Sequence, residues 1–136
     1  MAPKPVYEID GNRFSTLEGF YDEISRVLIP GAYWGRNLDA FNDILRGGFG
    51  TPEGGFVFIW KNSQISRERL GYSETVRQLQ KQLETCHPSN RTRVAHEIDE
   101  ARHGRGSTIF DELIEIISVH SLGGREEKDG VELVLP

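Results

Sequence analysis

The sequence predicts an α/β fold, a three-stranded parallel sheet flanked by helices, in a single domain over residues 1–136. Two observations predict it. The spacing of apolar residues indicates the order strand, helix, helix, strand, helices, strand, which is typical of parallel strands joined by helical crossovers. In addition, the run FVFIW at residues 56–60 is apolar on both faces, as expected for the central strand of a parallel sheet covered on both sides.

The composition suits one globular domain. A chain of 136 residues, of which 37% are hydrophobic, can bury a core without support from disulfides or metals. The formal net charge is −5, whereas nucleic-acid binding needs clustered lysine and arginine. We therefore expect no direct nucleic-acid partner, while a basic protein partner is compatible with the charge.

Cysteine usage and hydropathy indicate the cellular compartment. The single cysteine, Cys86, excludes an internal disulfide and a cysteine-based zinc site, and it fits a reducing environment. The N-terminal stretch MAPKPVYEIDG has no apolar core of the kind found in signal peptides, and no apolar run approaches membrane-spanning length. These features predict a cytoplasmic protein without membrane association.

A strand and a helix are predicted at the start of the chain. Alternation of residue types predicts the strand over residues 6–9, followed by a turn. Ser15 or Thr16 is the predicted N-cap of the helix, which ends shortly before the dipeptide Pro30-Gly31.

The next element is a short amphipathic helix for which Asn37 is the predicted N-cap. Its apolar face, at helical spacing, comprises Leu38, Phe41, Ile44 and Leu45. Asp39 and Asp43 stand four residues apart on a neighbouring face, where like charges repel by about 0.2–0.5 kcal/mol in an isolated helix. Folding alone does not need that arrangement, but a cationic partner would favour it. A glycine-rich loop, expected to be mobile, follows over residues 47–55.

Helices are predicted over most of the second half of the chain. One is capped by Ser73 and presents an apolar stripe of Val76, Leu79, Leu83 and Cys86. Another helix is predicted to start at Ser89 or Asn90 and to end at Gly104. Its inward-facing residues are predicted to be Val94, Ala95, Ile98 and Ala101. A third starts at Ser107 and continues to about His120. A charged loop then leads to a closing strand at residues 131–135.

Other side-chain groups give only weak signals for chemistry. Asp39 and Asp43 lack a third carboxylate or a histidine beside them in the sequence. They therefore do not indicate a metal site or a catalytic acid–base pair. His96 and His103 are about 10.5 Å apart along a helix axis, which is too far for shared metal ligation. Residues 104–108 lack the Gly-Lys-Ser/Thr ending of a phosphate loop, and Cys86 falls on an apolar stripe. We therefore predict no catalytic residue, no metal site and no cofactor.

The run from Tyr33 to Leu45, YWGRNLDAFNDIL, resembles the signature of the barstar family, intracellular inhibitors of a secreted bacterial guanyl-specific ribonuclease. The resemblance extends more loosely to the flanking strands and helix, and it implies the same three-stranded parallel sheet. Residues 63–105 have no counterpart in the compact type member. They are expected to form a helical insertion, which serves as a second binding surface, a dimer contact or an embellishment.

The resemblance also implies a mode of action without chemistry. The helix and the loop before it would plug the active site of the ribonuclease. Tyr33 matches a tyrosine that packs on the enzyme's catalytic histidine, Asp43 an aspartate in the phosphate pocket, and Asp39 a second aspartate. Further contact or shaping positions are matched by Gly35, Asn37 and Leu38. At least one of the aromatic side chains at positions 33 and 34 is expected at the surface, and the family comparison favours Tyr33.

Three positions depart from the family pattern. Asn42 stands where an interface tryptophan is expected, Arg36 replaces an acidic residue, and Phe49 is the aromatic nearest to a second expected tryptophan. An acidic residue of the last helix also contacts the enzyme in the family, and the candidates here are Asp111, Glu112 and Glu115. These departures bear on the identity of the partner more than on the mode of binding.

We therefore predict a bacterial protein of the antitoxin or immunity type. It binds a basic ribonuclease or ribonuclease-like toxin and is not itself an enzyme. The alternative is a non-inhibitory interaction or regulatory domain that uses the same scaffold on an unrelated protein. The predicted partner-binding residues are Tyr33, Gly35, Arg36, Asn37, Leu38, Asp39, Asn42, Asp43 and Phe49.

Overall fold

A computed structural model describes residues 4–47 and 50–136 and contains one three-stranded parallel sheet. Its strands are β1 (Val6–Asp10), β2 (Val57–Lys61) and β3 (Glu132–Val134), in the order β1-β2-β3. The register pairs Val57 of β2 with Val6 on one side and with Glu132 on the other. The predicted fold class is confirmed, and the predicted apolar run forms the central strand.

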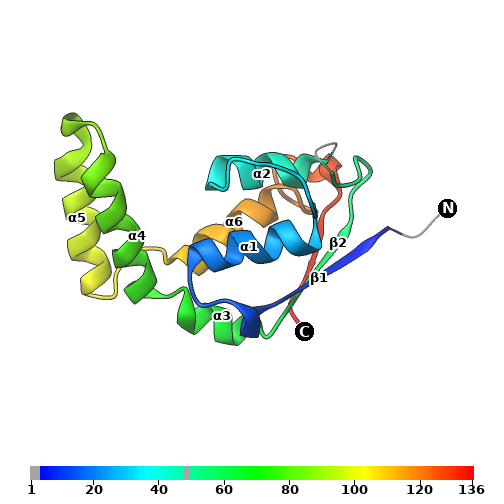
Figure 1. The fold of residues 1–136 in the computed structure, drawn as a ribbon, viewed down its shortest axis with the longest axis horizontal. Coiled ribbons are helices and arrows are strands. Elements are labelled where there is room, and N and C mark those ends of the chain that lie inside the picture. The colour runs from blue at the N-terminus through cyan, green and yellow to red at the C-terminus, as the bar shows by residue number, and fades with distance from the viewer. Residues whose placement is uncertain (1–3, 48–49) are drawn as a thin grey trace.

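The described residues form six α-helices besides this sheet. They are α1 (Leu17–Val27), α2 (Leu38–Arg46), α3 (Ser63–Arg69), α4 (Tyr72–Thr85), α5 (Arg91–Arg102) and α6 (Ile109–Val119). In Figure 1, α1, α2 and α6 lie together against one side of the strands. The antiparallel pair α4 and α5, called here the hairpin, extends away from this body at the end opposite the strands (Figure 1).

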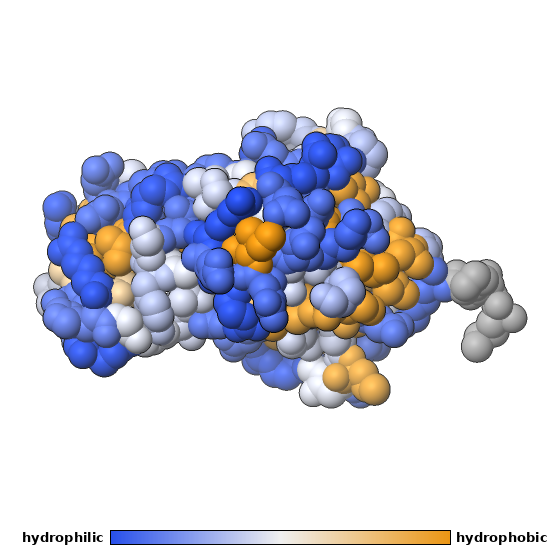
Figure 2. Space-filling model, turned by 90° about the horizontal axis from the view of Figure 1, so that it is seen from below, coloured by the Kyte–Doolittle hydropathy of each residue, from blue (hydrophilic) through white to orange (hydrophobic). Residues whose placement is uncertain are grey.

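The sheet is covered on one face only, so the expected cover on both faces is wrong. Phe58 and Trp60 are fully buried, whereas Ile59, between them on the other face, is only partly buried, and Val6 at the sheet edge is 59% exposed. Right-handed crossovers in the order β1-β2-β3 place both helical connections on the same face. In Figure 2, apolar atoms gather on the side of the molecule where the strands lie, and the hairpin side is mostly hydrophilic.

Aromatic rings form the centre of the core. The ring of Trp60 lies 5.3 Å from that of Phe20 on α1 and 5.2 Å from that of Phe110 on α6, measured between centroids. Phe41 on α2 packs edge-on against Phe20, at 5.2 Å. The indole N–H of Trp60 donates a hydrogen bond to Ser66 Oγ at 3.0 Å, so its polar atom is satisfied inside the core. Three helices are therefore fixed to the central strand through one aromatic cluster.

The structure corrects three details of the predicted helices. α4 begins one residue before Ser73, which therefore lies inside the first turn and is not the cap. The cap of α6 is Thr108 instead of Ser107, because Thr108 forms a reciprocal capping box with the third residue of the helix. Ala95 is exposed, since α5 buries only the face that packs against its hairpin partner and the body.

Hydrogen bonds and ion pairs tie the hairpin to α1. The buried carboxylate of Glu74 on α4 accepts a hydrogen bond from the first backbone amide of α1 at 2.8 Å. From the α1 side, Glu18 pairs with Arg77, Gln78 and Lys81 of α4. Burial raises the pKa of Glu18, but the hydrogen bonds from Gln78, Arg77 and Lys81 outweigh it and lower that pKa to about 2.

We predict that Glu18→Gln destabilises the protein at neutral pH and that this effect shrinks in acid. The folded-state pKa of Glu18 is depressed from its ordinary value of 4.5 to about 2. Its stabilising contribution is therefore fully present above about pH 4.5 and is lost as the pH falls towards 2. Because the side chain is partly exposed, solvent screening keeps the effect modest. Urea denaturation at several pH values measures it, with Glu84→Gln on the exposed face of α4 as control. A destabilisation that does not vary with pH would contradict the assignment.

Candidate partner-binding site

The helix α2 has one buried face and one exposed acidic face. Phe41, Ile44 and Leu45 are buried in the core, while Asp39 and Asp43 are exposed. Asn37 caps the helix as predicted, because its side-chain Oδ1 accepts a hydrogen bond from the backbone N–H of the third helical residue at 2.8 Å. The two carboxylates therefore sit on a helix whose position is fixed by its apolar side.

The two aromatic residues before α2 have opposite environments. Trp34 is 4% exposed, and its indole N–H donates to Ser25 Oγ at 2.7 Å while its ring packs edge-on against Tyr21. Tyr33 is 94% exposed. The expectation that at least one of these rings lies at the surface is confirmed for Tyr33. Trp34 anchors the loop, and the exposed Gly35 continues the loop towards α2.

Arg36 ties the same loop to α1. Its guanidinium forms an ion pair with Asp22 and a longer hydrogen bond to the backbone carbonyl of Glu18 at 3.4 Å. The residue adopts a left-handed conformation with φ of 52°, which costs roughly 1–2 kcal/mol for a residue other than glycine. The positive charge that departs from the family pattern is thus partly compensated by Asp22.

The two aspartates of α2 differ in their contacts. Asp43 accepts a hydrogen bond from Arg46 at 2.6 Å, and Arg46 also pairs with Glu126 through two contacts of 3.1 and 3.3 Å. Asp39 has no ion pair within residues 4–47 and 50–136, and it lies in the first turn of α2, where the helix dipole favours a negative charge. Arg46 thereby offsets the repulsion between Asp39 and Asp43.

A buried histidine lies directly behind α2, and the sequence reasoning did not single it out. His120 is fully buried, with Nδ1 2.7 Å from an oxygen of Asp129 and Nε2 2.6 Å from the side-chain oxygen of Asn42. Because the carboxylate oxygen of Asp129 and the amide oxygen of Asn42 both only accept, each ring nitrogen donates, Nδ1 to Asp129 and Nε2 to Asn42. Asn42, predicted as a contact residue, thus also has an internal partner. The sequence signal was the phase of His120, three residues after Ile117 on the buried stripe of α6.

His120, Asp129 and Glu126 hold their possible metal-ligand atoms within 4.8 Å of one another. The charges and protons in this group already satisfy one another, since Nδ1 of His120 donates to Asp129 while Glu126 is paired with Arg46. Arg46 also lowers the pKa of the Glu126 carboxyl through its hydrogen bonds. The arrangement is that of an ion-pair network that joins α2 to the segment before β3.

The remaining predicted residues occupy different places. Leu38 is half-buried, and Phe49 lies outside the described residues. Among the acidic candidates on α6, the carboxylate of Asp111 accepts a hydrogen bond from the backbone of the N-cap at 3.0 Å. Glu115 is exposed, and Glu112 is partly buried beside the hairpin.

On the hairpin, His96 and His103 each face a carboxylate on the same helix. Glu97 on the same helix pairs with Arg93 at 2.8 Å. These are exposed pairs of the kind that contributes little to stability.

We predict that His120→Ala lowers the free energy of unfolding by about 2 kcal/mol or more, because each buried polar partner left unpaired costs about 1–3 kcal/mol. His96→Ala, which changes an exposed histidine within α5, is the matched control and should alter stability by less than about 0.5 kcal/mol. Urea denaturation of the three proteins gives the comparison. Equal stability of the two variants would show that the network behind α2 contributes nothing.

Comparison with known proteins agrees with this geometry. The sequence model of the Barstar family, described as "Barstar (barnase inhibitor)", matches residues 4–101, which run from β1 into α5. The "Putative ribonuclease inhibitor YrdF" of Bacillus subtilis (strain 168) is 36% identical over 69 residues, or 50% of this chain and 72% of that protein. No helix within the described parts of the chain is both long and apolar enough to cross a membrane. Because the family match covers more than half of the 136 residues and includes the whole of α2, the chain belongs to the Barstar family.

Proposed function

We propose that this protein binds a bacterial guanyl-specific ribonuclease, or a ribonuclease-like toxin, and blocks its active site with α2 and the loop before it. Membership of a family of barnase inhibitors supports an inhibitor of this kind, as does the similarity to a protein named as a ribonuclease inhibitor. The observation that carries the proposal is the exposure of Asp39 and Asp43 on α2 and of Tyr33 in the loop before it, with the helix fixed by its other face.

The proposed mechanism is mimicry of a phosphate by a carboxylate. A ribonuclease active site has to gather positive charge in order to hold a phosphodiester. Asp43 would enter this phosphate pocket, with Asp39 one helical turn away and Tyr33 packed on an aromatic or imidazole ring of the enzyme. Charge complementarity of this kind both steers association and holds the complex.

Arg46 allows Asp43 to pair with the enzyme at a small cost in free energy. In the free protein Arg46 holds Asp43, and in the complex the cations of the enzyme would take over that carboxylate. Arg46 would not be left unpaired, because Glu126 keeps it through two hydrogen bonds. The exchange therefore leaves no buried charge without a partner on the inhibitor side.

Rigidity of the site favours tight binding. The apolar face of α2 is buried, Asn37 caps the helix, and Asn42 is held by His120. Because these contacts exist before the partner arrives, little conformational entropy is lost on association. A preformed binding surface of this kind suits a protein that acts by occupying the active site of its partner and catalyses no reaction itself.

The departures at Arg36 and Asn42 favour one alternative, a domain that uses the same face to bind a protein without nuclease activity. Arg36 reverses an acidic position, and the amide of Asn42 replaces a large ring and is engaged with His120. Capture of partners on the immobilised protein, followed by a ribonuclease assay of each partner, distinguishes the two functions.

Asp43→Ala is expected to stay folded and to lose several kcal/mol of affinity for the ribonuclease. The side chain is exposed and off the apolar face, so the fold does not depend on it. In the complex its removal would leave enzyme cations buried without a counter-charge. Close charge pairs couple by about 1.5–7 kcal/mol, a range measured on the barnase–barstar complex itself and not on this chain.

The measurement is an inhibition titration against barnase and against the ribonucleases encoded in the source genome. Asp99→Ala, an exposed aspartate on α5, serves as the control, and circular dichroism checks the fold of each variant. A folded Asp43→Ala protein that binds within a factor of about three of the wild type, under 1 kcal/mol, would falsify the active-site block.

Arg36→Glu is expected to speed association with a basic ribonuclease, because it adds negative charge to the binding face. The effect should be largest at low salt, where ions do not screen the long-range electrostatic attraction. Arg102→Glu changes the net charge by the same amount on α5, away from α2, and is the matched control. Stopped-flow association rates over a range of salt concentrations test this. If both variants gain the same rate, position 36 does not face the partner.

A further inference from the structure

Two large apolar side chains are almost fully exposed within the described parts of the chain, Leu122 at 95% and Tyr33 at 94%. The next in exposure, Val6, reaches 59%. A single exposed leucine is common on protein surfaces and by itself indicates nothing. Leu122 differs from such a residue because the chain presents it on a fixed turn, and because that turn lies beside α2.

A tight turn presents Leu122 to the solvent. The backbone N–H of Gly124 donates to the carbonyl oxygen of Ser121 at 2.9 Å and closes a β-turn over residues 121–124, called here the leucine turn. Leu122 is the second residue of this turn. Gly123, the third, has φ of 91°, in the left-handed region that favours glycine. Its backbone N–H donates in addition to a carboxylate oxygen of Glu127 at 2.8 Å. The turn is therefore specified by its own residues.

The leucine turn packs directly on the end of α6. A Cβ atom on Gly124 would collide with the carbonyl oxygens of Ser118 and Val119, so the turn approaches the helix as closely as only glycine allows. A little further along the chain, the backbone N–H of Glu126 donates to the carbonyl oxygen of Val119 at 2.8 Å. Because these contacts fix the turn, Leu122 is held in place before any partner arrives.

Both flanks of the leucine turn are joined to α2. Before the turn, Nε2 of His120 donates to Oδ1 of Asn42 at 2.6 Å. After it, Glu126 accepts two hydrogen bonds from Arg46, at 3.1 and 3.3 Å. The same arginine donates to Asp43 at 2.6 Å. The turn between these two contacts therefore lies beside the part of α2 that carries Asp43.

Exposed apolar side chains thus flank the two carboxylates of α2. Tyr33 lies in the loop before the helix, and Leu122 lies beside its C-terminal half. An exposed apolar side chain gains free energy when a partner removes it from water, and a charge gains by meeting its opposite. This surface fits a partner that has apolar groups next to a cationic pocket.

We propose that Leu122 is an apolar contact for the same ribonuclease that α2 binds, and that it packs on an aliphatic or aromatic patch of the enzyme beside the phosphate pocket. This inference rests on the proposed function. Leu122 lies beyond residues 4–101, the range of the family match. The contact extends the binding face from α2 to the leucine turn and selects ribonucleases that carry an apolar patch at this place.

The test compares Leu122→Asn with Leu135→Asn, the same substitution at a leucine that is 42% exposed near the C-terminus, which Figure 1 shows away from α2. Neither variant changes the net charge, so long-range attraction to the enzyme is the same in both. The partner is the ribonuclease, barnase or one encoded in the source genome, that the wild-type protein inhibits.

Leu122→Asn is expected to weaken binding of this ribonuclease at least about tenfold, because the apolar surface of a leucine is no longer removed from water. Leu135→Asn is expected to change it less than about twofold. Circular dichroism and urea denaturation check that both variants are folded. Equal affinities of the two variants would overturn the proposal.

The kinetics of binding distinguish an apolar contact from a charged one. Leu122→Asn should raise the dissociation rate and leave the association rate and its salt dependence unchanged, since long-range steering depends on charge. Asp43→Ala, which removes a charge, should alter the salt dependence as well. Stopped-flow measurements over a range of salt concentrations give both rates. A loss in Leu122→Asn that lies entirely in the association rate would contradict the assignment.

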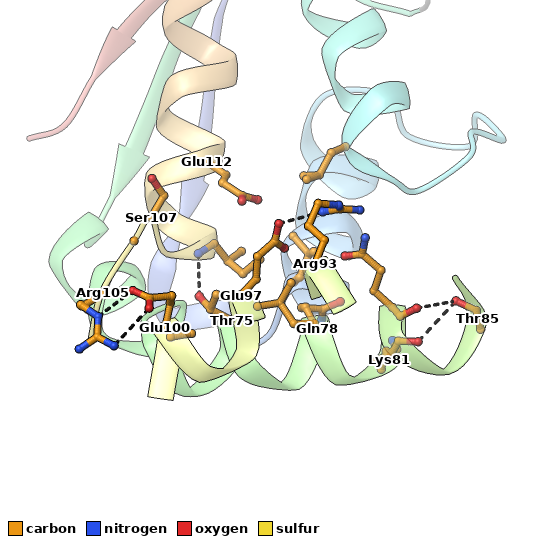
Figure 3. Close-up of a pocket in the computed structure, with 17 residues that line it drawn as sticks. Thr75, Gln78, Lys81, Thr85, Arg93, Glu97, Glu100, Arg105, Ser107 and Glu112 are labelled. Atoms are coloured by element: carbon orange, nitrogen blue, oxygen red, sulfur yellow. Dashed lines mark hydrogen bonds and ion pairs between the residues drawn. The ribbon is translucent and has the colours of Figure 1, made fainter. Parts of the chain in front are cut away.

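A groove of about 870 Å³ between the hairpin and the body is the competing surface, because part of its lining is apolar (Figure 3). Its arginines already have partners, since Arg93 pairs with Glu97 at 2.8 Å. Figure 3 shows this pair as a dashed contact on α5. Leu79→Asn changes an apolar residue of this lining. If it weakens binding of the ribonuclease and Leu122→Asn does not, the apolar contact belongs to the groove and the proposal is wrong.

Asp43→Ala separates this inference from the proposed function. If Asp43→Ala abolishes inhibition while Leu122→Asn binds as tightly as the wild type, the leucine contact is wrong and the active-site block stands. If the wild-type protein binds no ribonuclease, both fall. Sedimentation of the free proteins covers the remaining occupant. A wild-type dimer that Leu122→Asn dissociates would assign the leucine turn to a second copy of this chain and would overturn the proposal.

Discussion

The packing of α2 on the aromatic cluster around Trp60 is the constraint on which the rest of the structure depends. Phe41 of α2 packs against Phe20 of α1, and Phe20 packs against Trp60 of the central strand, so one side of α2 is held by rings from two other elements. Burial of a large apolar side chain stabilises a fold by about 1.5–3 kcal/mol, which makes this contact stronger than any exposed ion pair nearby. Because the apolar side is fixed, the acidic side has a defined direction. The exposed positions of Asp39 and Asp43 follow from the core.

A polar network behind α2 also fixes the position of this helix. His120 connects Asn42 of α2 to Asp129, and Arg46 connects Asp43 to Glu126, so two residues of α2 are linked to the segment that leads into β3. Residues beyond the range of the family match, which ends at residue 101, therefore help to position the helix that lies within it. The hairpin contributes in a different way, through Glu74 and the groove whose wall it forms.

The strands and helices of the fold and the acidic face of α2 could largely be predicted from the sequence, because local residue patterns determine them. The run at residues 56–60 indicated the central strand, and the Asn37 cap with its apolar spacing indicated α2. The covered face of the sheet was predicted less well, since an apolar strand does not tell on which side the crossovers pass. The role of His120 depends on a contact between distant segments, that between His120 and Asn42. Only the phase of His120 on α6 hinted at its burial.

The central claim is that α2 occupies the active site of a ribonuclease. Competition with guanosine 3′-monophosphate, the product expected of a guanyl-specific enzyme, tests it most directly. The nucleotide is bound to the ribonuclease, this protein is titrated in, and release of the nucleotide is followed by fluorescence or calorimetry. If α2 fills the phosphate pocket, the two ligands exclude each other, and the apparent affinity of the protein falls in proportion to the nucleotide concentration. A ternary complex in which the ribonuclease holds both ligands with undiminished affinity would contradict the account.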